Sequence, residues 1–578
     1  MLRAKRVTYG KAVAGLLAIH LAMLGWIAAW NSPVCDEVGH LTAGLYEWKF
    51  GYYFMYRVNP PLVKMVAAIP AALGNPKVNW RNILDSPDVR TEFVVGQEFI
   101  RANGPNACWY FAAGRVLCLP FTVLGGWMCF LWGRSLYGPR SGLVACLMWC
   151  MSPLVLGWGA IFTPDAAATS FGLLAAYRYR EWLNSGSWST AIWAGLTFGV
   201  CELTKTTWIV LFPLWPMMWM AWRFKDYKDR TSLKAETGQL GLILLICVYV
   251  MNVGYGFEGT CKTLGSYDFV SNSLNGHQGT KKAGNRFRGT ILAQVPVPLP
   301  YNYVRGIDLQ KVDFENGMSS FLFGTWSDRG WWYYYPVASC LKLPLGMLLL
   351  LAIAVVGHLT PKSKLKFTRD EMVLIVPAVV VFLFICSQNG FGRYVRYIMP
   401  SLPATLILIS KLWNHSWSRW ATRCHLSLLL WSILSSLWVY PYSMSYFNEL
   451  AGGPSGGHRY LLDANVDWGQ DLIRLRSWSK AHPEAKPLYS ASMGFVRPDE
   501  VGVQSTWPYY MPSPGKGVDE DYTPGPGWYA ISIHELHERH GHYRYMHKYT
   551  PVDRVGYSIW IYHIPAEIDT LAKRKNKL

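Results

Sequence analysis

Long apolar runs alternate with short polar and basic segments along most of this chain. Residues 240–250 and 373–386, for example, contain no charged side chain. An α-helix needs roughly 20 mostly apolar residues to cross a bilayer, so the pattern predicts a polytopic α-helical membrane protein. We expect about eleven transmembrane helices, near residues 12–30, 110–131, 142–160, 166–182, 188–204, 207–222, 239–255, 336–357, 371–387, 398–412 and 425–442.

Composition and charge give these helices an orientation. Of the 578 residues, 51% are hydrophobic and 16% are charged, and the net charge is +19. This charge does not predict a nucleic-acid partner, because Lys and Arg collect in short loops, as the positive-inside rule requires. The basic clusters lie near residues 3–11, 134–140, 178–180, 223–234, 362–369 and 411–423. If all are cytoplasmic, the chain is a multi-pass inner (cell) membrane protein with its N-terminus in the cytoplasm.

Three segments then fall outside the membrane. Residues 31–109 and 256–335 form two outer loops of a transmembrane module that covers residues 1–442. In the first loop, residues 41–56 and 61–73 have the spacing of short helices that lie in the interface plane. Residues 443–578 contain Pro/Gly turns and alternating stretches at 527–533 and 556–564, which predict an extracytoplasmic α+β domain.

Carboxylates follow the first span at the outer rim. Asp36 and Glu37 come directly after it, and Asp165 opens the fourth span on the same side. Charge near lipid is costly and is by default a sign of function, and such a carboxylate can act as a general base. The structural alternatives are solvation for the first pair and, for Asp165, a helix N-terminal acid that complements the helix dipole, with Thr163 or Asp165 as the cap.

Cations gather on the same side, against the positive-inside trend. They are Arg115, Lys205, Arg393 and Arg396. Arg and Lys at such positions suit a phosphate, whereas snorkelling at the interface is the structural alternative. The chain has neither a GxxxxGK[ST] loop nor a GxGxxG turn. We therefore favour a lipid-linked donor that enters from the bilayer over a soluble nucleotide.

Two further features remain open from the sequence. Residues 463–471 resemble a calcium loop, but the glycine comes one place late and position twelve is Arg474 instead of Glu. If this stretch is helical, its three acids share one face. Cys35, Cys108 and Cys261 fall in outer segments, and their spacing does not decide whether any of them pair.

The order and spacing of these motifs resemble those of a known superfamily. The residues that carry the resemblance are Asp36, Glu37, His40, Asn59 to Leu62, Lys64, Arg115, Thr163 to Asp165, Leu203 to Lys205, and Arg393 to Pro400. They are similar to the Asp-Glu…His-Pro-Pro-Leu pattern and later motifs of dolichyl-phosphate-mannose protein mannosyltransferases. These enzymes and the bacterial aminoarabinose transferases are GT-C glycosyltransferases. Asn59 stands where the mannosyltransferases usually carry His.

The resemblance implies a GT-C fold and an inverting transfer of a sugar from a polyprenyl phosphate to a hydroxyl group. It implies that Asp36 is the base, that Glu37 and Asp165 act beside it, and that Arg115, Lys205, Arg393 and Arg396 hold the phosphate. The residues expected to contact substrate are His40, Asn59, Lys64 and Tyr397. The scheme requires no cofactor or metal, and a divalent cation near Asp36 and Asp165 is left as an alternative. The expected partners are membrane lipids, the polyprenyl-phosphate-linked sugar and an acceptor protein, polysaccharide or lipid.

Two other classes of protein are weighed against this interpretation. Intramembrane charges also serve transporters and lipid flippases, but the charges here lie on one side of the membrane and the spans show no repeated halves. The second rival is a membrane-anchored scaffold whose functional part is residues 443–578.

Overall fold

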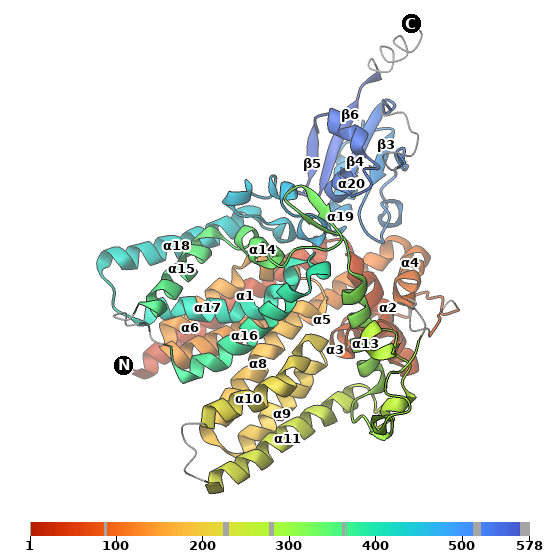
Figure 1. The fold of residues 1–578 in the computed structure, drawn as a ribbon. Coiled ribbons are helices and arrows are strands. Elements are labelled where there is room, and N and C mark those ends of the chain that lie inside the picture. Colours follow the sequence, from red (N-terminus) through yellow and green to blue (C-terminus); the bar gives the residue numbers. More distant parts are fainter. Residues whose placement is uncertain are drawn as a thin grey trace.

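The computed structural model describes residues 2–81, 83–85, 90–223, 230–276, 283–360, 365, 367–512 and 522–566. Parts of the basic clusters at 223–234 and 362–369 lie outside the described residues. Within these limits the chain is a large body of helices with a small sheet at one end (Figure 1).

Each of the eleven predicted spans corresponds to helix in the structure. The helices are α1 (Leu2–Trp30), α5 (Ala107–Tyr137), α6 (Pro139–Cys150) with α7 (Pro153–Gly159), α8 (Pro164–Ser185), α9 (Trp188–Glu202), α10 (Leu211–Arg223), α11 (Arg230–Gly254), α14 (Tyr334–Lys342) with α15 (Leu345–Leu359), α16 (Arg369–Ser387), α17 (Leu402–Ser410) and α18 (Arg419–Val439).

Fewer of them are long and apolar enough to cross a membrane on their own. In the described part of the chain, four stretches meet this condition: Tyr9–Trp30, Thr91–Tyr137, Leu233–Gly254 and Arg369–Ser387. The count reaches six if the pairs α6–α7, bent by 57°, and α14–α15, bent by 117°, each form one span. A membrane-spanning helical fold is thus supported, and the number eleven stays a prediction.

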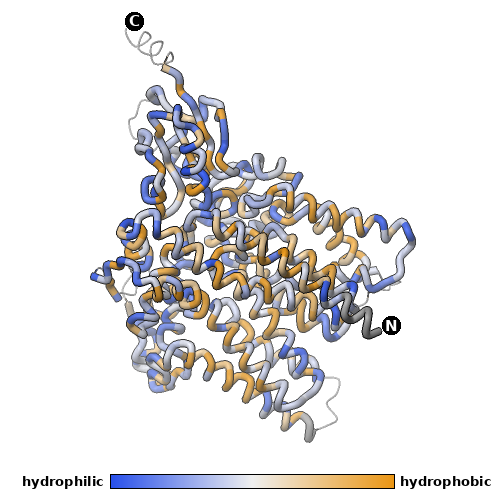
Figure 2. Tube along the Cα trace, turned by 180° about the vertical axis from the view of Figure 1, so that it is seen from behind, coloured by the Kyte–Doolittle hydropathy of each residue, from blue (hydrophilic) through white to orange (hydrophobic). Residues whose placement is uncertain are grey.

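Close helix contacts hold this body together. α5 packs against α1, α3, α6 and α8, and α9 packs against α8 and α11. Gly125 of α5 lies against the ring of Trp149, where an added Cβ would come within 2.3 Å of the indole. Small residues of this kind let membrane helices approach each other closely. Figure 2 shows that the helices are largely apolar along their length.

Three helices of the first outer loop lie beside the start of α5. They are α2 (Cys35–Phe50), α3 (Pro61–Gly74) and α4 (Thr91–Asn103). α2 packs against α3 and α4. The predicted helix at 61–73 is confirmed as α3, whereas the one predicted at 41–56 begins earlier, at Cys35, and ends before Gly51, which adopts a left-handed φ of 69°. Asp36 and Glu37 therefore occupy the first turn of a helix.

The second outer loop is mostly irregular and supports the first. It contains α12 (Asn272–Asn275), α13 (Tyr301–Asn316) and an antiparallel hairpin of β1 (Ser320–Leu322) and β2 (Thr325–Ser327). Gly306 of α13 lies against the backbone of Arg57, where an added Cβ would come within 2.1 Å of the carbonyl oxygen. A glycine at this position lets the two outer loops pack backbone to backbone.

A four-stranded sheet follows the last membrane helix. Its order is β3 (Leu488–Ala491), β4 (Gly527–Ser532), β6 (Ile559–Ile564) and β5 (Asp553–Val555). β3 and β4 are parallel, and the other pairs are antiparallel. With α19 (Leu472–Ala481) and α20 (Ile533–His537), it forms the part of the molecule that projects from the helices in Figure 1. The strands predicted at 527–533 and 556–564 are confirmed as β4 and β6; the domain boundary at 443 stays a prediction.

Candidate active site

The first turn of α2 sends its two carboxylates into different surroundings. The Asp36 side chain is 22% exposed, whereas Glu37 is fully buried. Glu37 is held by the helix start itself, because its carboxylate accepts the backbone N–H of Val34 at 3.1 Å. It also accepts the N–H of Phe162 at 3.2 Å. Successive residues of an α-helix point about 100° apart, so the two carboxylates do not share a cavity.

Glu37 and Arg115 form a buried pair. Arg115 Nε and Nη2 donate to the two oxygens of Glu37 at 2.9 and 2.5 Å. The remaining guanidinium hydrogens go to three carbonyl oxygens at the end of α1, those of Ala28, Asn31 and Ser32. All five N–H groups of this fully buried guanidinium are thus engaged. The geometry does not fit the expectation that Arg115 binds phosphate, and it gives Glu37, expected to act beside Asp36, a structural partner instead; both side chains fix the start of α2.

Asp36 belongs to a chain of alternating charges that joins four elements. Arg396 Nη2 donates to Asp36 at 2.7 Å, and Arg396 Nε lies 3.6 Å from Asp165. Asp165 in turn pairs with Lys205 at 2.5 Å. The residues come from α2, from η6 (Val395–Ser401), from the first turn of α8 and from the segment before η2 (Thr206–Val210). The structure therefore brings together four of the predicted site residues.

Asp165 and Thr163 do not cap α8 through their side chains. Thr163 is the N-cap residue, and its side chain makes no capping hydrogen bond. The Asp165 carboxylate is directed to the two cations instead. Asp165 is buried, and a buried carboxylate needs such partners to remain charged.

Aromatic rings enclose Arg396. Its guanidinium carbon lies 4.4 Å from the ring centre of Trp468, 4.9 Å from that of Tyr394, 5.2 Å from that of Trp158 and 5.3 Å from that of Tyr397. Cation–π contacts of this kind hold a cation in place without neutralising it. Trp468 lies beyond the last membrane helix, and no sequence signal connected it or Trp158 with Arg396.

Arg393 and the acidic stretch serve separate contacts. Arg393 pairs with Asp463, and its Nη1 contacts Met318 Sδ. Asp467 hydrogen-bonds to the hydroxyl of Ser532. Asp471 accepts from Ser558 at 2.6 Å and from Arg474 at 2.6 Å. Only residues 463–465 form a turn of helix, and α19 starts at Leu472, so the three acids do not share a helix face and point to different partners. Among the described residues no group of three or more His, Cys, Asp or Glu side chains is arranged to hold a metal ion.

Two other residues that were predicted to contact the substrate, Lys64 and His40, are buried. Lys64 is buried, pairs with Glu47 at 2.6 Å and donates to the carbonyl of Met55 at 2.9 Å, so it fixes the chain between α2 and α3 and does not reach a substrate. His40 is buried against Tyr56, with ring centres 4.4 Å apart. Burial, with the nearby charge of Lys64, holds the pKa of His40 well below its usual range, so the imidazole is neutral.

Two adjoining cavities meet at Lys205. The first has a volume of about 850 Å³ and is lined by Asp36, Asn59, Asp165, Arg396 and other residues. The second, of about 1040 Å³, has mostly apolar walls, which include Ile209, Val210, Ile307, Phe314, Phe384 and Ile385. Lys205, Gln310, Phe391 and Tyr397 line both. We call them the Asp36 cavity and the apolar cavity.

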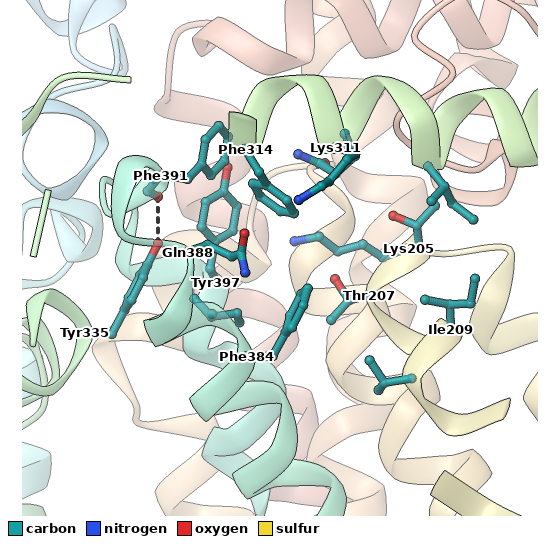
Figure 3. Close-up of a pocket in the computed structure, with 15 residues that line it drawn as sticks. Lys205, Thr207, Ile209, Lys311, Phe314, Tyr335, Phe384, Gln388, Phe391 and Tyr397 are labelled. Atoms are coloured by element: carbon teal, nitrogen blue, oxygen red, sulfur yellow. Dashed lines mark hydrogen bonds between the residues drawn. The ribbon is translucent and has the colours of Figure 1, made fainter. Parts of the chain in front are cut away.

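Lys311 is a site residue that the sequence analysis missed. Figure 3 shows Lys205 and Lys311 reaching into the apolar cavity from two different elements. Ile307, Lys311 and Phe314 are spaced by four and three residues along α13, which places them on one helix face. That spacing was the available signal, but an outer loop rich in Gly, Asn and Pro gave no reason to expect a helix there.

The cysteines make no disulfide bonds. All twelve lie in the described part of the chain and are free. Cys35 is buried, with its thiol 3.7 Å from the carbonyl oxygen of Trp468, whereas Cys261 is exposed. The question that the sequence left open for Cys35, Cys108 and Cys261 is thereby answered.

A family model matches part of this chain. Residues 111–255, about a quarter of the chain, match the model of the family described as Dolichyl-phosphate-mannose-protein mannosyltransferase. The match contains Arg115, Asp165 and Lys205 and confirms the resemblance found in the sequence. No curated protein matches the chain.

Solved structures of similar arrangement include three glycosyltransferases. ArnT from Cupriavidus metallidurans in the apo state has 13% identity and a TM-score of 0.46, over 95% of this chain and 97% of that one. The S. cerevisiae protein O-mannosyltransferase Pmt1-Pmt2 complex bound to the sugar donor has 17% identity and a TM-score of 0.33, over 43% and 33%. The oligosaccharyltransferase AglB from Archaeoglobus fulgidus, with an inhibitory peptide and a dolichol-phosphate, has 12% identity and a TM-score of 0.38, over 73% and 56%. These similarities assign no role to individual residues.

Proposed function

We propose that the chain is an inverting glycosyltransferase that moves a sugar from a polyprenyl-phosphate donor to a hydroxyl acceptor on the outer face of the membrane. The observation that carries this proposal is the position of Lys205. It lines both the apolar cavity and the Asp36 cavity, so a phosphate beside it would have a lipid-compatible space on one side and a carboxylate-lined space on the other.

Each part of the donor has a matching environment. The polyprenyl chain lies in the apolar cavity, where burial of each CH₂ group contributes roughly 0.8 kcal/mol. The phosphate lies between Lys205 and Lys311, whose ammonium groups are suited to it as point charges. The sugar extends into the Asp36 cavity, where Asn59 and Tyr397 offer hydrogen-bonding groups.

The reaction then follows from the order of these groups. The Asp36 carboxylate takes the proton of the acceptor hydroxyl, and the hydroxyl oxygen attacks the anomeric carbon from the face opposite the phosphate. As the new C–O bond forms, the bond to the phosphate oxygen breaks, and the electron pair leaves with the polyprenyl phosphate. Lys205 and Lys311 stabilise the charge that develops there. Arg396 fixes the direction of the Asp36 carboxylate, and Asp165 holds Arg396 and Lys205 in register.

The predicted roles of several residues change under this proposal, including that of Arg396, which positions Asp36 instead of holding the phosphate. Arg115 and Glu37 position α2, Arg393 anchors η6 to Asp463, and Lys64 supports the chain beneath Asn59. A flippase would also need the apolar cavity and Lys205, but it would have no use for a general base. Asp36 therefore separates the proposed enzyme from that alternative.

The test is sugar transfer by the purified full-length protein. A panel of radiolabelled polyprenyl-phosphate sugars is incubated with the protein in lipid nanodiscs, and release of polyprenyl phosphate is followed with and without membrane extracts as acceptor source. We expect turnover of one donor class, its loss in Asp36→Asn, and its retention in Asp268→Asn, an exposed outer-loop carboxylate paired with Arg288. Movement of the lipid across the bilayer without cleavage would instead favour the flippase.

The proposed orientation has its own test in two native cysteines. Cys261 and Cys424 are both exposed, and under the predicted topology the first lies outside and the second near the cytoplasmic end of α18. A membrane-impermeant maleimide should label Cys261 in intact cells and label Cys424 only after permeabilisation. The reverse pattern would contradict the orientation.

A further inference from the structure

A third cavity lies away from the charges that surround Asp36. It has a volume of about 900 Å³ and is bordered by the β1–β2 hairpin, by His458 and Arg459, and by residues 536–547. The walls carry aromatic rings, imidazoles and guanidinium groups together. We call it the histidine cavity. Nothing in the proposed transfer reaction uses these residues.

Three histidines line one wall of the cavity. The ring centre of His537 lies 5.1 Å from that of His458 and 4.9 Å from that of His547. Burial, followed by the nearby Arg459, lowers the pKa of His458 to about 4, and burial, followed by the neighbouring histidines, lowers that of His537 to about 3. Both rings are therefore neutral near pH 7 and offer hydrogen bonds without charge.

Two of these imidazoles have polar atoms without a partner. His458 Nδ1 and His537 Nε2 make no hydrogen bond within the described part of the chain, and His458 is only 7% exposed. A buried polar atom without a partner costs roughly 1–3 kcal/mol. Polar atoms left unpaired beside a cavity can have their hydrogen bonds completed by a bound ligand or by water.

The charges of the cavity favour an anion. Arg459 and Arg544 line it. Arg544 Nη1 donates to two backbone carbonyls, those of Pro512 and Gly541. The lining carboxylate, Glu538, is already engaged with the backbone N–H groups of His540 and His542 at 2.7 Å. The cavity thus presents two guanidinium groups against the single carboxylate of Glu538, a net positive charge.

No residue lines both the histidine cavity and the Asp36 cavity, but neighbouring positions of the same chain segments connect them. Phe321 lies three residues after Met318, which lines the Asp36 cavity. Arg459 lies four residues before Asp463, the partner of Arg393. The backbone N–H of Phe323 donates to the carbonyl of Tyr460 at 3.0 Å and joins the two segments. A ligand in the histidine cavity therefore lies next to the segments that wall the site of transfer.

We infer that the histidine cavity binds an acidic saccharide portion of the acceptor, through Arg459 and Arg544, with the neutral imidazoles and the rings of Phe321 and Trp326 contacting the sugar. Trp326 is held rigidly for such a contact, because its indole N–H donates to the carbonyl of His537 at 3.0 Å. Guanidinium groups suit carboxylates and phosphates, and aromatic and hydrogen-bonding groups together suit a sugar ring. This inference rests on the proposed function, because it assigns the ligand to the acceptor.

The test measures binding apart from transfer. The full-length protein in nanodiscs is titrated calorimetrically with hexagalacturonate, with a phosphorylated mannan oligosaccharide and with neutral maltohexaose. We expect at least one acidic probe to bind at least tenfold more tightly than the neutral one. The double variant R459A/R544A should lose at least tenfold in affinity, R459K/R544K should retain most of it, and R497A, which removes an arginine elsewhere in the same region, should bind as the wild type does.

The possible results separate this inference from the proposed function. Equal binding of acidic and neutral probes, binding of neither acidic probe, or unchanged affinity in a correctly folded R459A/R544A would overturn the inference and leave the transfer reaction standing. The Asp36→Asn variant should bind the acidic probe normally. If it does so while the wild type cleaves no polyprenyl-phosphate sugar, the cavity is supported as a saccharide site and the glycosyltransferase proposal fails.

Discussion

Asp36 and Glu37 are neighbours in sequence but belong to different regions of the molecule. Glu37 forms a buried pair with Arg115, whereas Asp36 lines a cavity. In the buried pair every polar hydrogen of Arg115 has an acceptor and neither side chain meets solvent. Around Asp36, carboxylates and cations alternate along the wall of the cavity, and the Asp36 carboxylate remains partly exposed. A charged group whose hydrogen-bonding positions are all filled by protein partners stabilises the structure. A group with unfilled positions can instead contact a substrate.

The largest expected loss of stability follows from breaking the buried Glu37–Arg115 pair. Glu37→Ala leaves Arg115 buried without its carboxylate, and removal of one partner of a buried pair costs about 3–5 kcal/mol. We expect much lower thermal stability in detergent and poor folding yield. The double variant Glu37→Met/Arg115→Met should recover part of the loss, because no unpaired charge remains. A single variant with wild-type melting temperature would show that the pair is not structural.

The open region should respond in activity and not in stability. Asp36→Asn preserves shape but cannot accept a proton, so single-turnover transfer should fall at least about a hundredfold, the low end of what general-base catalysis contributes. Donor binding and melting temperature should stay near wild-type values. Near-normal transfer in Asp36→Asn would move the base to Asp165 or Asp313, the other two carboxylates that line the cavity.

A smaller effect is expected where the two cavities meet. Lys205→Ala removes a charge-assisted contact to the donor phosphate worth about 1.5–3 kcal/mol, which corresponds to roughly a ten- to hundredfold loss in kcat/KM for the donor. Lys311→Ala should lose less, because this side chain is more exposed. Lys262→Ala, in the same outer loop but over Tyr301, is the matched control. Equal kinetics in all three variants would remove Lys205 from the phosphate site.

The smallest effect concerns pH and the sheet region. Burial raises the pKa of Asp467 to about 7, so the folded state favours the protonated carboxyl. Its stabilising contribution is present at low pH and is lost as the pH rises from about 4, the unfolded value, through 7. Asp467→Asn imitates the protonated form. Its melting temperature should match the wild type at pH 5 and exceed it at pH 8, by about 2 °C or more.

The two regions also differ in how well the sequence predicts the roles of their residues. The sequence predicts that Asp36, Asp165, Lys205 and Arg396 lie on one side of the membrane, because apolar runs and basic loops indicate which helix ends share a face. It grouped Arg115 and Glu37 with them, since both lie at the same depth. Depth does not specify the direction of a side chain, and the helix that begins at Cys35 turns Glu37 toward α5 and away from the cavity.

The residues that the sequence missed share another property. Lys311 lies on a helix in an irregular outer loop, and Trp468 lies beyond the last membrane helix. Both approach the site through contacts between segments far apart in sequence, Trp468 over Arg396 and Lys311 beside Lys205 across the apolar cavity. Local sequence patterns do not predict such pairs, because the hydrophobic periodicity of each segment would be the same if the other segment were absent.

The sequence by itself determined a helical membrane body, the strands β4 and β6, and the presence of carboxylates and cations at one rim. These depend on local quantities: the length of an apolar run, the period of its polar positions and the sign of the loop charges. Only the tertiary structure decided which charged side chains are buried with all their hydrogen-bonding partners and which line a cavity. That distinction depends on the direction and packing of side chains from α2, α5, α8 and η6 together, and no single segment contains it.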